Sequence, residues 1–358
     1  MGRGGPTMKV VYFSKYSELG PSSRYRIYQF LPYLAAAGIV CQVRPFWGTA
    51  YFKLLAVQSW PLRFVAMVAY TPLRVLRRVL DLFRANRADL IVIQDQLFPY
   101  FPPIIERLLA RLQYRLALEF DDAIYLTRFH GGKMPALLRL ASAAIVGNET
   151  LACYASAHTP RISVVPTVID TERVRPLDPG VGVGEEAVTI GWIGLSYNFS
   201  YLNLIQGVLQ ELQQSHGVRF RVISSYAPRL AGVDVEFRRW SLEGELADLQ
   251  GCQIGVMPLP DNNWTRGKCG LKLLQYMAVG IPPVASPVGV NREIVCNGEN
   301  GFLVDSEKEW YDRLALLCEN SELRTQMGQA ARRMVEERYS LKVWGPRLAE
   351  IYRKVATS

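Results

Sequence analysis

The alternation of apolar and polar positions divides the chain into two successive series of strands and helices. In the first half, apolar runs at Val10–Ser14, Leu90–Gln94 and Leu116–Phe120 have the length of strands buried on both faces. A second series begins at Val188 and continues to an apolar run at Ile254–Leu259. Because strands that alternate with helices indicate a parallel sheet, the pattern predicts an α/β fold with two Rossmann-like domains.

The first strand opens a βαβ unit. A loop with Gly20 and Pro21 follows it, then a predicted helix at Arg24–Ala37 that ends before Gly38, then a strand at Ile39–Arg44. The loop lacks the G-x-G-x-x-G spacing, so the fingerprint of NAD-binding proteins is absent.

The length of 358 residues exceeds that of a typical single core and supports a division into domains. A stretch rich in proline and glycine marks a linker at residues 176–187. The sequence therefore predicts domains at residues 1–175 and 188–338, followed by a C-terminal helix at residues 339–358.

The stretch Gly267–Ser286 combines a glycine-bearing loop, an amphipathic helix and a short strand. The loop Gly267–Gly270 opens the helix, and Gly280 ends it before Pro282 and Pro283 turn the chain. A glycine loop at a helix N-terminus presents free N–H groups and the positive end of the helix dipole, which suits a phosphate.

The run GLKLLQYMAVGIPPVAS in this stretch resembles the donor-binding motif of the retaining GT-B glycosyltransferases of family 4. Two glutamates belong to that motif, and their places fall at Gly267 and Gln275, so both acids are replaced. The alternative is a plain helix–turn–strand of any α/β protein. The motif positions that match are Gly270, Leu271, Leu274, Met277, Ala278, Gly280, Pro282, Val284 and Ala285.

The resemblance implies a GT-B fold, in which two Rossmann-like domains face each other across a cleft and the C-terminal helix crosses back to the first. It also implies a hexosyltransferase that takes a nucleotide-diphosphate sugar (NDP-sugar) as donor substrate, with no further cofactor. No D-x-D motif occurs in the chain, as expected for a metal-independent enzyme of this class.

The resemblance places the donor in the second domain, with cations and backbone N–H groups at its pyrophosphate. The loop after the strand at Val188 offers hydroxyl and amide groups there but no Arg or Lys. Gln275 is expected to contact ribose or sugar hydroxyls, and the base to lie against the Trp240–Leu242 loop. The predicted donor-binding residues are Gly194, Ser196, Asn198, Ser224, Trp240, Leu242, Arg266, Gly267, Lys268, Cys269, Gly270, Leu271 and Gln275.

Asp121 and Asp122 follow a predicted strand of the first domain, at the sheet edge where α/β proteins bind ligands. Many family members have a histidine at the place of Asp121, so this carboxylate is expected to bind sugar hydroxyls or orient the acceptor nucleophile. A turn or helix-cap pair is the alternative. The predicted catalytic residues are Asp121, Asp122 and Lys268.

The acceptor-binding candidates lie in the first βα loop, where the resemblance places the acceptor and sugar. A capped helix with surface arginines explains the same residues. These candidates are Gly20, Ser22, Ser23 and Arg24.

Charge is uneven along the chain. Residues 1–175 carry 22 Lys and Arg against 11 Asp and Glu, or +11, within a total of +9. Within Leu73–Arg84, arginines share one face and leucines another, which predicts an interfacial helix on an anionic membrane. The alternative is a helix with its apolar face in the core and a solvated basic face. Nucleic acid is not an expected partner, because no recognition motif accompanies the basic half.

The six cysteines are scattered without ligand spacing, so disulfides and structural zinc are not expected. We interpret Met1–Thr7 as a short leader rather than a signal peptide. These features favour a cytoplasmic location, with a peripheral position at the inner face of the membrane.

The sequence thus favours a retaining glycosyltransferase of polysaccharide or lipid-linked saccharide biosynthesis. Two alternatives remain open at this point. Loss of both glutamates suits a degenerate, non-catalytic subunit that binds sugar nucleotides, and paired carboxylates suit a GT-B sugar-nucleotide epimerase.

Overall fold

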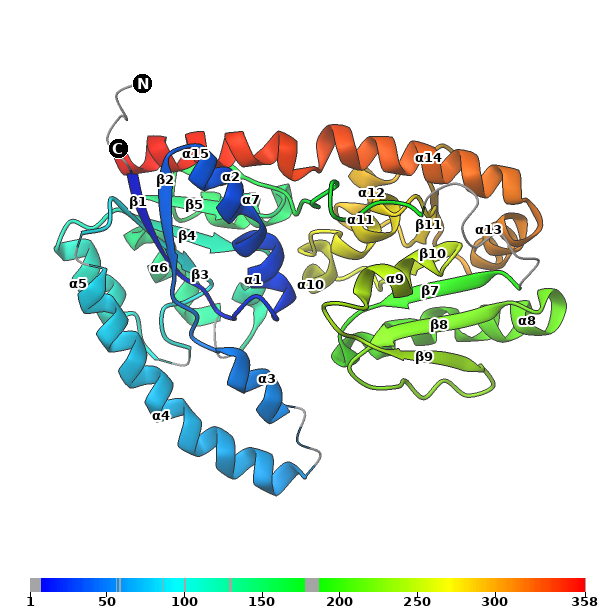
Figure 1. Ribbon diagram of the computed structural model, residues 1–358, viewed down its shortest axis with the longest axis horizontal. Helices are drawn as coiled ribbons and strands as arrows, with labels where there is room; N and C mark the ends of the chain where they lie inside the picture. Colours follow the sequence, from blue (N-terminus) through cyan, green and yellow to red (C-terminus); the bar gives the residue numbers. More distant parts are fainter. Residues whose placement is uncertain are drawn as a thin grey trace. The chain divides into compact units, whose positions relative to one another are not determined.

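The computed structural model describes residues 8–55, 57, 59–85, 87–99, 101–128, 131–177 and 187–357. The interpreted leader Met1–Thr7 and residues 178–186 of the predicted linker lie outside this part. Two compact units make up the chain: unit 1 comprises Met1–Thr167 with Val343–Ser358, and unit 2 comprises Val168–Lys342. Each unit contains a six-stranded parallel sheet (Figure 1).

The sheet of unit 1 has the strand order β2-β1-β3-β4-β5-β6. Its inner strands β1, β3, β4 and β5 are almost wholly buried, as the apolar runs predict. Because all strands are parallel, the loops after β1, β3 and β4 meet at one carboxyl edge. The strands are β1 Met8–Phe13, β2 Ile39–Val43, β3 Leu90–Gln94, β4 Leu116–Phe120, β5 Ala143–Val146 and β6 Ile162–Val164.

The sheet of unit 2 has the strand order β12-β11-β10-β7-β8-β9. Its order reverses beside β7, which pairs with β10 on one side and β8 on the other. Such a switch point is where open α/β sheets bind ligands at their carboxyl edge. The strands are β7 Thr189–Ile193, β8 Arg219–Ser224, β9 Val235–Arg239, β10 Ile254–Met257, β11 Pro283–Ala285 and β12 Phe302–Leu303.

The core of unit 2 lies between this sheet and its helices. Trp192, Phe220 and Trp310 are buried in one cluster that joins β7, β8 and α13. The helical segments are η4 Ser196–Ile205, α8 Gln206–His216, α9 Glu245–Gln250, α10 Asn263–Arg266, α11 Leu271–Ala278, α12 Asn291–Ile294, α13 Glu307–Glu319 and α14 Ser321–Arg338.

The predicted continuous helix at Arg24–Ala37 is wrong, because the structure divides this segment into α1, η1 and α2. Ile27 has φ −129°, outside the helical region, and Pro32 lacks the N–H that would continue the ladder. The helical segments of unit 1 are α1 Pro21–Arg26, η1 Tyr28–Phe30, α2 Leu31–Ala36, α3 Thr49–Leu55, α4 Trp60–Arg84, α5 Ile104–Arg111, η2 Ile124–Leu126, η3 Gly131–Lys133, α6 Met134–Leu140, α7 Glu149–Ser156 and α15 Leu341–Thr357.

The C-terminal helix α15 returns to unit 1, as predicted. Tyr352 is fully buried, and its hydroxyl bonds the hydroxyl of Tyr12 on β1 at 3.0 Å. Gly345 packs against Tyr33, where a Cβ atom would lie 2.7 Å from the ring. The last helix therefore completes the hydrophobic core around the first strand.

Helix α4 presents its apolar side outward, so the alternative of a core-facing apolar side is wrong. Phe83 is 73% exposed and Leu76 is 59% exposed, whereas Arg78 is buried. The N-terminal end of α4 extends beyond the sheet of unit 1 (Figure 1). We call the exposed side the apolar face of α4; it consists of Leu62, Val65, Leu73, Leu76, Leu80 and Phe83.

Candidate active site

The stretch Gly267–Ser286 folds as the loop, helix and strand that the sequence predicts. Gly270 caps α11 with φ +69°, a left-handed conformation that favours glycine. A Cβ atom at this position would also lie 2.3 Å from the side chain of Ile294. Glycine is therefore required here both by the backbone angle and by the packing.

Tyr276 fixes helix α11 on the sheet of unit 2. Its hydroxyl accepts a hydrogen bond from the Ile193 amide at 3.1 Å and donates to the Val256 carbonyl at 3.3 Å. Its ring lies so close to Gly255 that a Cβ atom there would approach it to 2.3 Å. These contacts hold α11 against the ends of β7 and β10, beside the point where the strand order reverses.

Lys272 lies in the first turn of α11, next to the carboxyl end of β7. Its Cε would lie 2.7 Å from a Cβ atom on Gly194, and its Nζ lies 5.2 Å from the ring centroid of Trp192. A cation in the first turn opposes the helix dipole, unless an anion binds there. The sequence analysis did not single out Lys272, although a lysine where acids are usual was a readable signal.

The two predicted cations of the donor loop have nearby partners of their own. Arg266 forms a two-pronged ion pair with Asp261, at 2.6 and 3.1 Å, and is 53% exposed. Lys268 Nζ lies 5.7 Å from the ring centroid of Trp264. The ion pair neutralises much of the charge of Arg266, which makes it the weaker candidate for a diphosphate.

Gln275 contacts a carboxylate from elsewhere in the chain. Its Nε2 donates to Oε1 of Glu245 at 3.2 Å, and Trp240 Nε1 donates to Oε2 of the same group at 2.6 Å. Glu245 opens α9 and precedes Gln275 by thirty residues. The sequence motif did not point to Glu245, because only the fold brings it to α11.

The remaining predicted donor residues lie along the same edge of unit 2. Ser224 ends β8, and its buried hydroxyl has no hydrogen-bond partner in the described part of the chain. The Trp240 amide bonds the Ser224 carbonyl at 2.9 Å, which brings the turn after β9 to this point. The other positions are partly or wholly buried: Ser196 and Asn198 in η4, Leu242 in the turn after β9, Gly267 and Cys269 in the loop before α11, and Leu271 at the start of α11.

In unit 1, Ser22 and Asp121 come together at the carboxyl edge of the sheet. Ser22 Oγ donates to Asp121 Oδ1 at 3.0 Å and accepts from Gln94 Nε2 at 3.0 Å. Ser23 is fully buried, and its hydroxyl donates to Gln94 Oε1 at 2.6 Å and accepts from the Tyr16 amide at 3.0 Å. Ser22 is thus at the edge with Asp121, whereas Ser23 fixes the loop beneath it.

Asp121 has an altered acidity. Burial raises the pKa of this carboxyl to about 8, and the neighbouring carboxylates of Asp122 and Glu119 act in the same direction. At neutral pH the group is therefore largely protonated and able to donate a hydrogen bond. This property matches a group that binds a hydroxyl more closely than it matches a permanently charged acid.

The loop after β3 adds polar groups that the sequence analysis did not single out. Lys15 Nζ pairs with Asp95 Oδ2 at 2.9 Å, and Asp95 has φ +59°, rare for a residue other than glycine. The buried Oδ1 of Asp95 and the side-chain amide of Gln96 have no hydrogen-bond partner among the residues described. No sequence motif identifies this loop, because only the order of the strands brings it to the carboxyl edge beside the loops after β1 and β4.

The other two acceptor candidates lie at the start of α1. Gly20 packs against Tyr16, and a Cβ atom there would lie 2.4 Å from the tyrosine. Arg24 is largely buried, with its guanidinium 5.0 Å from the ring centroid of Tyr25. Both residues therefore shape the first loop and the first turn of α1.

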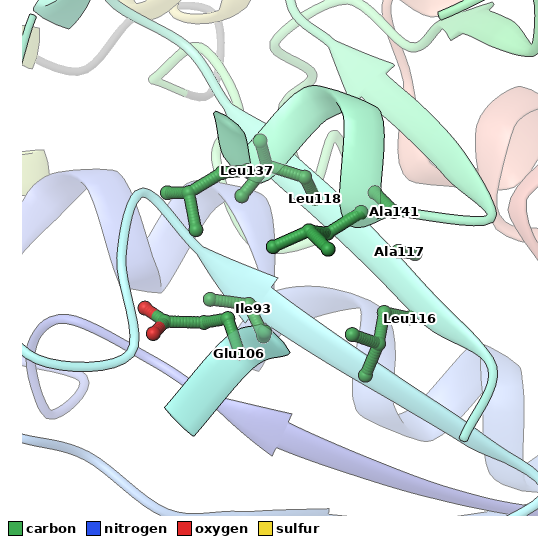
Figure 2. Close-up of a pocket in the computed structure, with 8 residues that line it drawn as sticks. Ile93, Glu106, Leu116, Ala117, Leu118, Leu137 and Ala141 are labelled. Carbon is green, nitrogen blue, oxygen red and sulfur yellow. The ribbon is translucent and has the colours of Figure 1, made fainter. Parts of the chain in front are cut away.

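Figure 2 shows a void on the opposite side of the same sheet, beneath α5 and α6. Leu116, Leu118 and Leu137 surround it, with the carboxylate of Glu106 to one side. Its volume of about 10 Å³ is at the lower limit for one water molecule. The void is a packing defect of unit 1 and too small for a sugar or nucleotide.

Residues 249–334, which include the loop, α11 and β11, match the sequence profile of the family described as glycosyl transferases group 1. A D-inositol 3-phosphate glycosyltransferase of Corynebacterium urealyticum is 24% identical over 230 residues, which cover 56% of this chain and 53% of that protein. The chain thus spans about half the length of this relative.

Two solved structures resemble the whole chain. Sucrose-phosphate synthase from Thermosynechococcus elongatus has a TM-score of 0.70 at 13% identity and covers 98% of this chain and 100% of its own. Anabaena Alr3699/HepE, solved with UDP and glucose, has a TM-score of 0.73 at 15% identity, with coverages of 97% and 100%. These likenesses confirm the predicted GT-B fold, with its two parallel six-stranded sheets.

Proposed function

We propose that this chain is a glycosyltransferase that transfers a sugar from an NDP-sugar to a saccharide or lipid-linked acceptor. The observation that carries the proposal is the α11 turn, where Gly270 frees the helix N-terminus and Lys272 adds a cation at the end of β7. The group 1 profile covers this turn, and one structural neighbour is a complex with UDP and glucose.

In this proposal the departing diphosphate binds at the N-terminus of α11. Backbone N–H groups at the start of α11 and the ammonium groups of Lys268 and Lys272 offset the negative charge that develops as the glycosidic bond breaks. The absence of a D-x-D motif from the sequence favours transfer without a bound metal. Retention of configuration and membership of family 4 follow from the motif resemblance and belong to the same proposal.

Gln275 and Glu245 supply the hydroxyl-binding groups of the donor site. Since the amide of Gln275 donates to the Glu245 carboxylate, the pair offers an acid beside the place of the missing motif glutamate. Carboxylates are strong acceptors for the hydroxyls of ribose and hexose. Trp240 holds Glu245 through its indole N–H, which fixes the direction of the carboxylate.

The acceptor half-site is proposed at the carboxyl edge of the unit 1 sheet, with Ser22 and Asp121 at its centre. The protonated carboxyl of Asp121 is suited to bind a hydroxyl of the acceptor or of the transferred sugar. Asp122 and the Lys15–Asp95 pair contribute further polar groups at this edge. A lipid-linked saccharide fits the excess of positive charge in the first half of the chain.

We place this activity in the cytoplasm, at the inner face of the membrane. Among the helices that the structure describes, none is both long and apolar enough to cross a bilayer. The proposed location rests on the excess of positive charge in the first half of the chain.

In one alternative, the chain binds the donor but catalyses no transfer. Both motif glutamates are replaced, at Gly267 and Gln275, which suits a subunit that binds sugar nucleotides without turnover. A sugar-nucleotide epimerase would instead place acid and base carboxylates around the sugar. Free NDP release in the presence of acceptor distinguishes transfer from both alternatives.

The first experiment measures thermal stabilisation of the full chain by UDP-, GDP-, ADP- and TDP-linked sugars. We expect one of these nucleotides to raise the melting temperature, and the Lys272→Ala variant to reduce that rise. Lys308→Ala, at an exposed lysine of α13, is the matched control that should keep it. Binding by none of the four nucleotides, in a folded protein, would reject the proposal.

A further inference from the structure

The orientation of α4 is fixed by its arginines. Arg74 donates to the carbonyls of Pro45 and Phe46, at 2.6 and 2.5 Å, and Arg78 donates to the carbonyl of Ser14 at 2.9 Å. Arg78 is 2% exposed, although it is a charged residue. These bonds tie the polar side of α4 to the body of unit 1 and set the rotation of the helix about its axis.

This rotation leaves the apolar face of α4 in solvent. Its members recur at helical spacing from Leu62 to Phe83, over a helix of 25 residues that is about 38 Å long. Trp60 and Phe64 are also exposed at its N-terminal end, which extends beyond the sheet (Figure 1). A continuous exposed apolar strip of this size marks an interaction surface.

The charge along the borders of this face has one sign. Arg77 and Arg84 are exposed beside it. Asp81 is the single acid of α4, and it is buried within 4 Å of Arg44 and Arg84. No exposed carboxylate of α4 opposes an approaching anionic surface.

We propose that α4 docks in the interface of an anionic lipid bilayer, with its apolar face toward the acyl chains and Arg77 and Arg84 at the head groups. Charge complementarity favours a bilayer over a second copy of this chain, because two such faces would bring like-charged arginines together. The helix lies on the membrane and does not span it, in agreement with its arginine content.

The proposal specifies the surface behind the proposed membrane location, and it can be tested with no donor or acceptor present. The full chain is floated with vesicles of phosphatidylcholine alone and with vesicles that contain 30% phosphatidylglycerol. We expect binding to the anionic vesicles and at least roughly tenfold weaker binding to the neutral ones, since arginines near the surface add electrostatic attraction.

Two double variants separate the contributions. Leu76→Glu with Phe83→Glu should lower partitioning into anionic vesicles about tenfold or more, because it places charges in the apolar face. Arg77→Gln with Arg84→Gln should remove most of the preference for anionic lipid. Leu204→Glu, at an exposed leucine of unit 2, is the control and should bind like the unchanged protein.

Circular dichroism and the melting temperature verify that each variant folds, which is expected because the substituted residues are exposed. Light scattering after gel filtration measures oligomeric state in the same samples. Equal vesicle binding by the unchanged protein and the Leu76→Glu, Phe83→Glu variant would overturn the proposal. So would a dimer that this variant dissociates, combined with no vesicle binding by the unchanged protein.

Discussion

At the carboxyl edge of the unit 2 sheet, backbone geometry forms the candidate site, whereas side-chain pairs form it at the same edge of unit 1. In unit 2, Gly270 and the N-terminus of α11 form the candidate surface, and Tyr276 holds the helix in place. In unit 1, the edge consists of Ser22 with Asp121 and of Lys15 with Asp95.

The difference matches the ligands proposed for the two edges. A diphosphate is similar in every NDP-sugar, so a backbone cradle can bind it whatever the sugar. An acceptor is recognised by the positions of its hydroxyls, which requires particular side chains. In the proposed reaction, unit 2 therefore binds the part that all NDP-sugars share, and unit 1 distinguishes one acceptor from another.

A large loss of stability is expected from a substitution at Gly270, which caps the N-terminus of α11. Gly270→Ala should lower the free energy of unfolding by about 2–4 kcal/mol, because it combines a left-handed backbone with an overpacked contact to Ile294. Gly217→Ala is the matched control, since its φ is +61° and its added Cβ meets nothing within 4 Å. Urea denaturation of both variants measures strain with and without the clash, and equal losses would contradict the packing argument.

The next effect concerns charge at the cradle. Lys272→Ala should weaken binding of the stabilising nucleotide diphosphate by about 10–100-fold, as expected for one charge-assisted hydrogen bond. Stability without ligand should stay equal or rise, because the substitution removes a cation from a helix N-terminus. Calorimetry and melting curves test the two parts together. Parallel losses of affinity and stability would instead indicate a structural role.

A smaller effect is expected at Glu245, whose carboxylate contacts Gln275. Glu245→Gln should weaken binding of the same nucleotide about tenfold or less, since a neutral amide replaces a charged acceptor. Adding Gln275→Glu to that variant should restore affinity, because the acid returns to α11. If the double variant binds no better than Glu245→Gln alone, the two positions do not share one carboxylate function.

The last effect concerns pH at the unit 1 edge. Aspartate ionises near pH 3.9 in an unfolded chain, whereas Asp121 ionises at about 8 in the fold. Its contribution to stability is therefore complete below about pH 4 and is lost as the pH rises through about 8. Asp121→Asn should flatten the fall in melting temperature between pH 5 and 9, whereas Asp312→Asn, an exposed control, should leave it unchanged. A profile unaltered by Asp121→Asn would refute the raised pKa.

The sequence predicted the parts of this molecule that depend on local pattern. Apolar runs placed the buried strands, and Gly270 and Gly280 placed the two ends of helix α11, because positive φ angles select glycine at both positions. The prediction of one continuous helix at Arg24–Ala37 was wrong, although it too rested on local pattern. The effect of Pro32 was not weighed against the apolar spacing.

What the sequence did not predict depends on contacts between distant segments. Glu245 reaches Gln275 only because α9 packs beside α11, and Ser22 reaches Asp121 across 99 residues. The direction of the apolar face of α4 was left open between a membrane-facing and a core-facing helix. The pattern gave the two faces of the helix, but the direction of each depends on carbonyl groups of the loop Arg44–Phe46.

The pairing of Tyr12 with Tyr352 has a consequence for biosynthesis. During translation, most residues of unit 1 leave the ribosome first, but α15, which covers β1, follows only after unit 2. Until then the groove that receives Leu348, Ala349 and Tyr352 stays open to water. The half of the protein that is made first is therefore the half that finishes folding last, and shortening the chain by its final helix leaves that half incomplete.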